Sequence, residues 1–328
     1  MTVTVSGYYG FGNTGDEAIG LAVATELKRR GVQPVFLSAD PSFTGRAWGV
    51  RACGRMSPVA VGRALLQSRA LVSGGGGLLQ DATSRRTLQY YLAVVWLARR
   101  LGRKVIVLDQ SVGPLSAWGE GAVRRALAGA VVTVRDRESL AYLERLGIPA
   151  TLGGDPALLL AAPRVERDES RVVLAPRGGQ PEATARLAGV ARQLLNEGRR
   201  VTALSFQPGV DTPEARRLAE EVPGVAFAEV STPEAALAEI AAAGFVLGVR
   251  LHACILAAAC GVPFAGVAYD PKVSGFCRDA RAPVLDVAFT LGEAVEAVAS
   301  VPDWAAVTAM RQRAAASLDR VAREAGKR

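Results

Sequence analysis

Residues 2–37 read TVTVSGYYGFGNTGDEAIGLAVATELKRRGVQPVFL, and the order of patterns in this stretch decides the fold. The run Thr2–Ser6 alternates and predicts a short strand, and a glycine-rich loop then leads into a helical pattern. A second apolar run follows at residues 35–37. Because a strand, a helix and another strand in succession form the crossover unit of a parallel sheet, the opening of the chain predicts an α/β fold.

The same alternation continues to residue 267, which predicts strands at 70–73, 105–108, 131–134, 172–175, 201–204, 245–247 and 264–267. A chain of 328 residues exceeds the size at which a single core keeps growing. We therefore expect two Rossmann-like, doubly wound lobes at 1–162 and 163–302, and a closing helix at 303–328. Ligands bind such sheets outside the carboxyl ends of the strands, so we expect a ligand cleft between the lobes.

The composition narrows the class of partner. The net charge of +8 comes mostly from arginine, which suits carboxylate and phosphate ligands. The arginines are dispersed and form no basic run interleaved with aromatic residues, so we expect no nucleic-acid partner. An anionic small molecule or a membrane surface fits better. We find no signal peptide and no transmembrane stretch, which predicts a cytoplasmic protein.

One helical pattern combines aromatic and basic residues. Tyr90, Tyr91 and Trp96 precede the basic residues at 99–104, and such a helix could touch the cytoplasmic face of an anionic inner membrane. The alternative is that these aromatic side chains pack in the core. The sequence therefore predicts either peripheral membrane contact or core packing for this helix.

The first glycine-rich loop ends in two acidic residues. Asp16 and Glu17 follow Asn13 at the start of a helix, where a dinucleotide loop would bind a pyrophosphate. Two carboxylates would repel that anion, so a sugar hydroxyl is the better ligand. The alternative is that Asp16 only caps the helix.

Further polar groups follow strands of the N-terminal half. We expect residues 74–77, four consecutive glycines, to form a loop in which Gly75 and Gly76 let a ligand or another chain segment approach closely. We expect Asp81 to begin the next helix. Gln110 starts another loop at the same edge of the sheet. These residues are candidates for contacts with an acceptor.

The C-terminal half predicts an anion site. Arg250, Leu251 and His252 follow the strand at 245–247 and lead directly into a helix, which brings together an arginine, the only histidine and a helix N-terminus. Arg177 and Lys272 each follow another predicted strand and could bind the same ligand. The alternatives are a structural histidine and a solvated lysine. No His, Cys or carboxylate cluster has metal-ligand spacing, so we expect no metal and no cofactor.

Four motifs in order resemble the polysaccharide pyruvyl transferase family. They are GFGNTGDEA at 10–18, SGGGGLLQD at 73–81, QSVGP at 110–114 and GVRLH at 248–252. Within that family the closest resemblance is to the CsaB type, and it extends over nearly the whole chain. The sequence departs from the pattern at Asp109, where the family pattern suggests glycine, and in the surroundings of Arg177.

The resemblance implies a GT-B-like fold and an enzyme. It implies transfer of the enolpyruvyl group of the co-substrate phosphoenolpyruvate onto two hydroxyls of a sugar, as a 4,6-ketal. The sugar of this type is a β-linked N-acetylmannosamine of secondary cell-wall polysaccharide or of its lipid-linked precursor, and the product anchors S-layer proteins. Arg177, Arg250 and His252 match donor-site positions. Our hypothesis makes His252 the general acid, with Asp16 or Glu17 acting on the acceptor.

Two other functions remain open on the sequence. One is a GT-B glycosyltransferase that uses a nucleotide sugar, and the other is a non-catalytic module that binds a sugar or an anion. Turnover of phosphoenolpyruvate with phosphate release separates both from a pyruvyl transferase.

Overall fold

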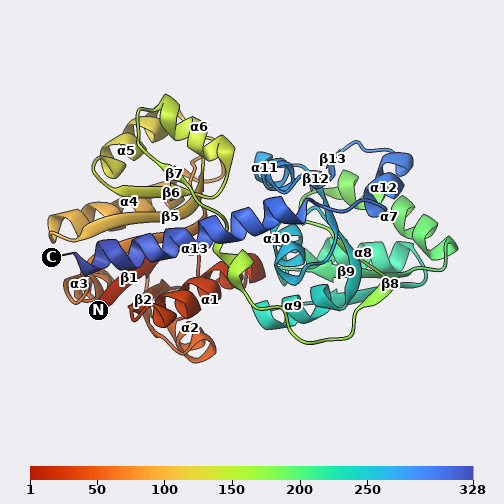
Figure 1. The fold of residues 1–328 in the computed structure, drawn as a ribbon, viewed down its shortest axis with the longest axis horizontal. Helices are drawn as coiled ribbons and strands as arrows, with labels where there is room; N and C mark the ends of the chain where they lie inside the picture. Colours follow the sequence, from red (N-terminus) through yellow and green to blue (C-terminus); the bar gives the residue numbers. More distant parts are fainter. Residues whose placement is uncertain (328) are drawn as a thin grey trace. The chain divides into compact units, whose positions relative to one another are not determined.

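The computed structural model describes residues 1–327, which form two compact units with one parallel sheet each (Figure 1). Unit 1 consists of Met1–Phe11, Ile19–Leu159 and Met310–Arg328, and unit 2 consists of Gly12–Ala18 and Leu160–Ala309. Each unit is a doubly wound, Rossmann-like α/β unit, so the predicted fold class is confirmed.

The sheet of unit 1 has seven parallel strands in the order β3-β2-β1-β4-β5-β6-β7. They are β1 (Thr2–Ser6), β2 (Gln33–Ser38), β3 (Arg51–Gly54), β4 (Ala70–Leu79), β5 (Lys104–Val112), β6 (Val131–Val134) and β7 (Thr151–Leu152). The order of the strands reverses between β1 and β4, which are direct neighbours. Residues such as Val3, Val5 and Leu71 are fully buried, as expected for a parallel sheet covered on both faces.

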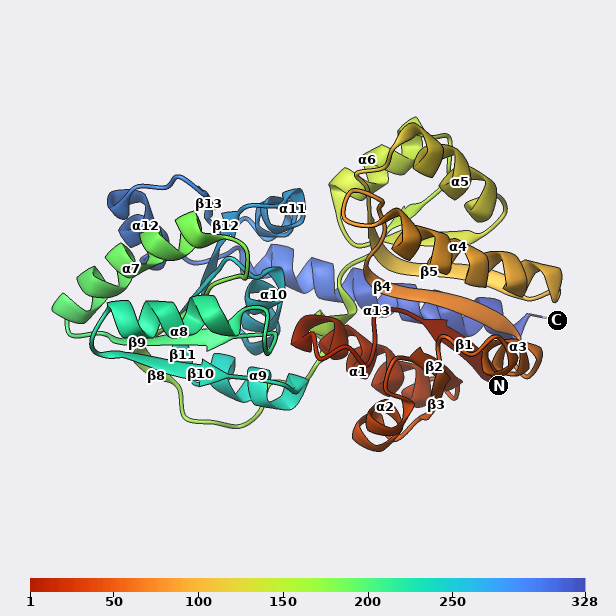
Figure 2. The ribbon, with the colours of Figure 1, turned by 180° about the vertical axis from the view of Figure 1, so that it is seen from behind.

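The helices of unit 1 begin at polar capping residues. Ser57, Ser84, Ser116 and Asp136 each accept a hydrogen bond from a backbone N–H in the first turn that follows. The helices are α1 (Thr14–Arg29), α2 (Pro41–Trp48), α3 (Pro58–Leu66), α4 (Arg85–Arg100), α5 (Ala117–Leu127) and α6 (Arg137–Arg145), with the 3-10 turn η1 (Pro156–Leu159) and the long α13 (Trp304–Gly326). The helix α4 runs alongside β4 and β5 (Figure 2).

Two of these helices contribute to both units. The first turn of α1 belongs to unit 2, because the backbone N–H of Thr14 donates to the carbonyl of Phe206 at 3.2 Å and its hydroxyl donates to the carbonyl of Val230 at 3.1 Å. The helix α13 likewise contributes residues 304–309 to unit 2 and the rest to unit 1.

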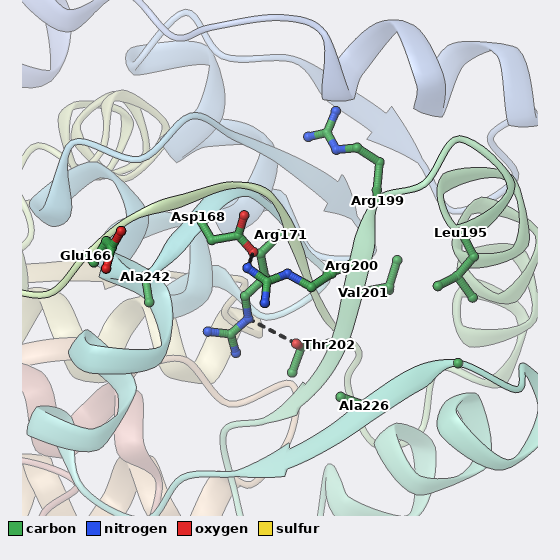
Figure 3. Close-up of a pocket in the computed structure, with 11 residues that line it drawn as sticks. Glu166, Asp168, Arg171, Leu195, Arg199, Arg200, Val201, Thr202, Ala226 and Ala242 are labelled. Atoms are coloured by element: carbon green, nitrogen blue, oxygen red, sulfur yellow. Dashed lines mark hydrogen bonds and ion pairs between the residues drawn. The ribbon is translucent and has the colours of Figure 1, made fainter.

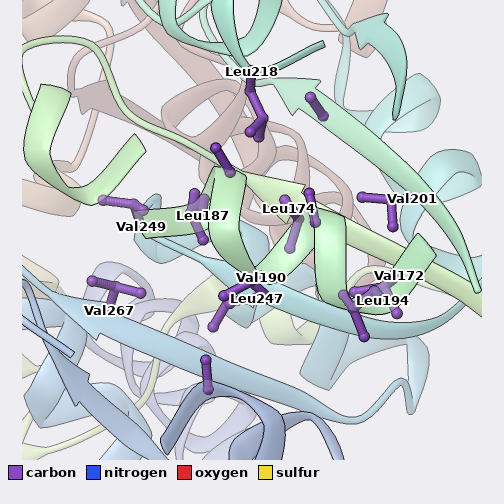
Figure 4. Close-up of a cluster of buried hydrophobic side chains, with 14 of the residues drawn as sticks. Val172, Leu174, Leu187, Val190, Leu194, Val201, Leu218, Leu247, Val249 and Val267 are labelled. Atoms are coloured by element: carbon purple, nitrogen blue, oxygen red, sulfur yellow. The ribbon is translucent and has the colours of Figure 1, made fainter. Parts of the chain in front are cut away.

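The sheet of unit 2 has six parallel strands in the order β10-β9-β8-β11-β12-β13. The strands are β8 (Asp168–Ala175), β9 (Arg200–Ser205), β10 (Val225–Glu229), β11 (Ala243–Gly248), β12 (Phe264–Ala268) and β13 (Val284–Asp286). The helices are α7 (Pro181–Asn196), α8 (Thr212–Glu221), α9 (Pro233–Ala241), α10 (Leu251–Cys260), α11 (Pro271–Asp279) and α12 (Leu291–Val298). Leu187 and Leu194 of α7 share a buried cluster with Val172 and Leu247 of the sheet (Figure 4).

Two stretches that the sequence predicts as loops are strands. β4 continues through the four glycines to Leu79, and β5 continues to Val112, so Gln110 lies in a strand. The ladder between β4 and β5 pairs Gly76 with Gln110. Backbone pairing needs no side chain, so tertiary pairing overrides the low strand propensity of glycine here.

Asp81 does not begin α4, contrary to the prediction. The helix starts four residues later, after the cap Ser84. The carboxylate of Asp81 instead accepts two hydrogen bonds from Ser116, one from its backbone N–H at 2.8 Å and one from its hydroxyl at 2.5 Å. Within residues 1–327, no helix is both long and apolar enough to cross a membrane.

Candidate functional site

The strand order of unit 2 reverses between β8 and β11, and loops at such a point are the usual ligand sites of doubly wound sheets. The loop after β8 carries Arg177, and the loop after β11 carries Arg250. The carbonyl of Ala175, the last residue of β8, accepts hydrogen bonds from the backbone N–H groups of Val249 at 2.9 Å and Arg250 at 3.2 Å. The two arginine-bearing loops therefore start side by side.

The guanidinium of Arg250 is buried and held by two side chains. Its Nε donates to Oδ2 of Asp211 at 2.6 Å, and its Nη2 donates to Oδ1 of Asp211 at 2.7 Å and to Oε1 of Gln207 at 2.8 Å. A bidentate pair of this kind fixes the plane of the guanidinium. Arg250 is also the N-cap residue of α10, and its side chain does not bond to that helix.

Asp211 is fully buried, and its side chain bonds Arg250 instead of capping its own helix. It occupies the N-cap position of α8, where an aspartate usually bonds the first turn, yet it makes no such bond. Its Oδ1 instead also accepts from the backbone N–H of Gly178 at 2.9 Å. Asp211 thus ties the loop after β8 to the arginine after β11. Sequence reasoning missed this residue, because an aspartate before Thr-Pro is typical of an ordinary helix start.

Arg177 lies over the ring of Tyr269, with 4.7 Å from Cζ to the ring centroid. Burial raises the pKa of the Tyr269 hydroxyl, and the charges of Arg177 and Arg250 act in the opposite direction. Arg177 therefore lies over this ring, and the charge of Arg250 also acts on its hydroxyl. Asp270 follows Tyr269 and caps α11 by accepting from the backbone N–H of Lys272 at 2.9 Å, which places Lys272 in the first turn of that helix.

His252 packs against the first turn of α1. A β-carbon added to Gly15 would lie 2.2 Å from Nδ1 of His252, so only glycine allows the imidazole to approach this closely. The same turn carries the half-buried Asp16 and the fully buried Glu17. Within unit 2 the structure therefore brings His252 to the helix turn that carries both predicted carboxylates.

The alternative prediction that Asp16 caps α1 is wrong. The helix begins at Thr14, and the backbone N–H of Glu17 donates to the carbonyl of Asn13 at 2.9 Å. The side chain of Asn13 accepts from the backbone N–H of Gly15 at 3.2 Å, so Asn13 is the cap. Asp16 is the third residue of the helix.

The candidate acceptor residues of unit 1 take part in its internal packing. Nε2 of the buried Gln110 donates to the carbonyl of Ser73 at 2.9 Å and to its hydroxyl at 2.8 Å. A β-carbon on Gly75 would lie 2.3 Å from Cγ2 of Ile19, so this glycine admits another chain segment, one of the two alternatives for the glycine run. Gly76 adopts φ = 85°, a conformation that favours glycine.

Asp109 is a fully buried acid at the position where the family pattern suggests glycine. Its φ of 46° lies in the left-handed region, which explains that pattern, although aspartate tolerates this region better than most residues. The hydroxyl of Ser317 in α13 donates to its Oδ1 at 2.8 Å. Burial raises the pKa of the carboxyl well above its usual value.

A pocket of about 570 Å³ opens at the other end of the unit 2 sheet, where β8, β9 and β10 begin (Figure 3). Its arginines already have partners in the protein: Nε of Arg171 donates to the hydroxyl of Thr202 at 3.1 Å, and Arg200 pairs with Asp168. Because ligands of parallel sheets bind at the carboxyl ends of the strands, we do not assign the site to this pocket. Nowhere in residues 1–327 do three or more His, Cys, Asp or Glu side chains form a set that could hold a metal ion.

Comparison with known proteins adds a family and confirms the fold. Residues 13–271 match the sequence model of the family described as polysaccharide pyruvyl transferase. No curated protein matches the sequence significantly.

Several solved structures are similar over nearly their full length. The UDP-GlcNAc 2-epimerase of Methanocaldococcus jannaschii has a TM-score of 0.63 at 12% identity, covering 98% of both chains. The S. aureus MnaA–UDP structure has a TM-score of 0.65 at 9% identity, covering 98% of this chain and 94% of that one. MurG of Acinetobacter baumannii has a TM-score of 0.55 at 14% identity, covering 100% and 99%. At these identities the likeness shows the fold alone, a GT-B-like pair of Rossmann-like units.

Proposed function

The chain belongs to the polysaccharide pyruvyl transferase family, and from this we propose that it transfers the enolpyruvyl group of phosphoenolpyruvate to a sugar as a cyclic ketal. The observation that supports the proposal is that Arg177 and Arg250 follow the two strands at the switch point of the unit 2 sheet, with His252 two residues after Arg250. The motifs of the sequence favour the CsaB type. The proposed acceptor is a β-linked N-acetylmannosamine, lipid-linked or polymeric, that receives a 4,6-ketal, and the product serves S-layer anchoring. The proposed place of the reaction is the cytoplasmic side of the membrane.

The donor carries a carboxylate and a phosphate, and two arginines are available for these two anionic groups. Arg250 uses Nε and Nη2 for Asp211 and Gln207, and none of its bonds within residues 1–327 involves Nη1. Its remaining N–H groups can donate to one anionic group of the donor, and Arg177 to the other. The N-terminus of α10, where Arg250 makes no side-chain cap, adds backbone N–H donors beside Leu251. Lys272 adds a further positive charge.

His252 is proposed as the general acid. It protonates the methylene carbon of phosphoenolpyruvate, which leaves positive character on the neighbouring carbon for one sugar hydroxyl to attack. Phosphate then leaves, and a second hydroxyl closes the ketal. The acceptor loses two hydroxyl protons. One restores the proton that His252 gave to the methylene carbon, and the other leaves with phosphate, so the reaction balances. Acid–base assistance of this kind contributes about 100- to 10,000-fold to the rate.

Asp16 and Glu17 are proposed to orient or deprotonate the hydroxyls of the acceptor. Both lie on the helix turn against which His252 packs, so acid and base would act on the same reacting centre. A carboxylate accepts hydrogen bonds from sugar hydroxyls and takes up the proton that each attack releases. Asn13, Gly75, Gly76, Asp81 and Gln110 remain candidates for contacts with the rest of the acceptor.

Phosphate release from phosphoenolpyruvate, with and without a synthetic lipid-linked disaccharide ending in N-acetylmannosamine, tests the proposal. Acceptor-dependent release is expected, and His252→Ala should lower kcat by about 100-fold or more while the protein stays folded. The matched control is Arg192→Gln, because Arg192 lies on the surface of the same unit and its ion pair within residues 1–327 is with Glu221.

Other outcomes identify the rival functions. Consumption of a nucleotide sugar without phosphoenolpyruvate turnover would indicate a glycosyltransferase. Binding of either ligand without turnover would indicate a non-catalytic module. Near-normal kcat in His252→Ala would remove His252 from the chemistry while leaving pyruvyl transfer intact.

A further inference from the structure

Four large apolar side chains are exposed on or just before two helices of unit 1. Met56 is 76% exposed and lies just before α3, and Val59 and Leu66 on that helix are 73% and 57% exposed. Trp96 of α4 is 58% exposed. Val59 and Leu66 are two helical turns apart and share one face of α3, opposite the buried Val61 and Leu65. We call Met56, Val59, Arg63, Leu66, Trp96 and Arg100 the α3–α4 face.

The two helices pack side by side on the same part of the sheet. Val61, Ala64 and Leu65 of α3 share a buried cluster with Val94, Val95 and Ala98 of α4. Contacts before and after α3 hold it along α4: the hydroxyl of Tyr90 donates to the carbonyl of Arg55 at 3.0 Å, and Arg103 donates to the carbonyl of Ser68 at 3.2 Å. The two helices therefore cover the same face of the unit 1 sheet, with their exposed side chains on the side away from it.

Aromatic residues of α4 divide between the core and this surface. Tyr91 is buried, and Tyr90 is half-buried with its ring 4.1 Å from the guanidinium carbon of Arg55, so the core-packing alternative holds for both tyrosines. Trp96 alone of the three is exposed, with the guanidinium carbon of Arg100 5.3 Å from its ring. The exposed indole therefore stands next to a cationic group.

The charge of the segment that contains α3 and α4 is strongly one-sided. Residues 41–108 contain eleven arginine and lysine residues and one acid, Asp81, whereas the whole chain has 39 basic and 31 acidic residues. The exposed Arg63 lies between Val59 and Leu66 on α3, and Arg99 and Arg100 end α4. Exposed apolar groups are thus interleaved with arginines in a region almost free of acids.

We propose that the α3–α4 face docks unit 1 on the surface of an anionic lipid bilayer. Aliphatic side chains would enter the boundary between headgroups and acyl chains, the indole of Trp96 would lie at that boundary, and Arg63 and Arg100 would bind lipid phosphates. A second copy of the chain does not fit, because symmetric pairing would bring two basic surfaces together. A nucleic acid would pair with the arginines and leave Met56, Val59 and Leu66 in water.

Vesicle flotation of the purified full chain tests this docking without any substrate, so its result does not depend on the proposed function. The expected result is binding to phosphatidylcholine vesicles that contain phosphatidylglycerol and much weaker binding to phosphatidylcholine alone. At about 1 M salt, where the Debye length falls to about 3 Å, binding should decrease strongly. Binding that is absent at low salt, or equal on both vesicles, would overturn the proposal.

Substitutions separate the two contributions. Arg63→Gln and Arg100→Gln should each weaken binding about fivefold, the effect expected for one basic residue at an anionic surface. The double change Val59→Ser and Leu66→Ser should weaken it about tenfold or more, because two aliphatic side chains no longer leave water. Val301→Ser is the matched control, since Val301 is 63% exposed and lies in unit 2, outside this face.

Two further outcomes decide the identity of the partner. If the serine double variant binds vesicles as tightly as the original protein, insertion is excluded and the proposal fails. If the protein binds duplex DNA more tightly than anionic vesicles, and the serine variant leaves DNA binding unchanged, the surface serves nucleic acid and the proposal also fails. The substituted side chains are exposed, so the variants should keep their melting temperatures, which a thermal melt verifies.

Discussion

Replacing Gly15 with alanine tests whether the position of His252 governs turnover. The new methyl carbon would lie 2.2 Å from Nδ1, 2.4 Å from Cγ and 2.8 Å from Cβ of His252. Carbon atoms normally keep about 3.5 Å between them, so the histidine must move by roughly 1 Å. Because the conflict includes Cβ, rotation of the ring alone cannot relieve it. A displacement of roughly 1 Å can cost about 100-fold in rate, so kcat for acceptor-dependent phosphate release should fall by about that factor.

The stability of this variant should change much less than its activity. Gly15 has an ordinary helical backbone, and alanine is favoured over glycine in helices by about 1 kcal/mol, which offsets part of an overpacking cost of about 1–3 kcal/mol. Gly189→Ala is the matched control, because Gly189 lies within α7 with no atom within 4 Å of the added carbon, and it should keep full activity. A folded Gly15→Ala enzyme with unchanged kcat would refute the reasoning.

Three further substitutions probe other parts of the structure. Asp211→Asn leaves the buried Arg250 without its counter-charge, so it should lower the free energy of unfolding by about 3 kcal/mol and raise KM for phosphoenolpyruvate; an unchanged KM would argue against Arg250 as a donor ligand. As pH rises above 3.8, the melting temperature of Asp109→Asn should rise relative to that of the original protein, because the raised pKa of Asp109 makes only the original protein lose stability until that pKa is passed. A difference in melting temperature that does not change with pH would contradict this. Gly75→Ala should press on Ile19 and lower the melting temperature, at about 2–4 °C per kcal/mol, whereas an unchanged melting temperature would contradict the packing role of this glycine.

The central strands could be predicted from the sequence, and the edges of the sheets could not. β11 and the buried part of β8, residues 172–175, appear as runs of apolar residues, and β1, although buried, appears as the alternating run TVTVS. The edge strands β3 and β10 are short and partly exposed, so their sequences resemble those of loops. The glycines of β4 carry no strand signal of their own, because their pairing with β5 comes from the tertiary fold.

The candidate site shows the same division. Arg250 and His252 could be found because they stand together after a predicted strand and before a predicted helix. Asp211 lies 39 residues before Arg250, and nothing in its local pattern indicates a partner at that separation. The contact of Gly15 with His252 likewise joins distant parts of the chain, although Gly15 itself belongs to the GFGNTGDEA motif at residues 10–18.

The division of the chain between its two units bears on the order in which they can be completed during synthesis. Every residue of unit 2 precedes Met310, whereas unit 1 still needs the remainder of α13, whose Ser317 bonds the buried Asp109 from 208 positions away. A ribosome therefore delivers unit 2 in full while unit 1, although begun first, lacks its last helix. Until that helix emerges, the surface that will receive it stays open to solvent and to other newly made chains, which is the condition under which chaperones act.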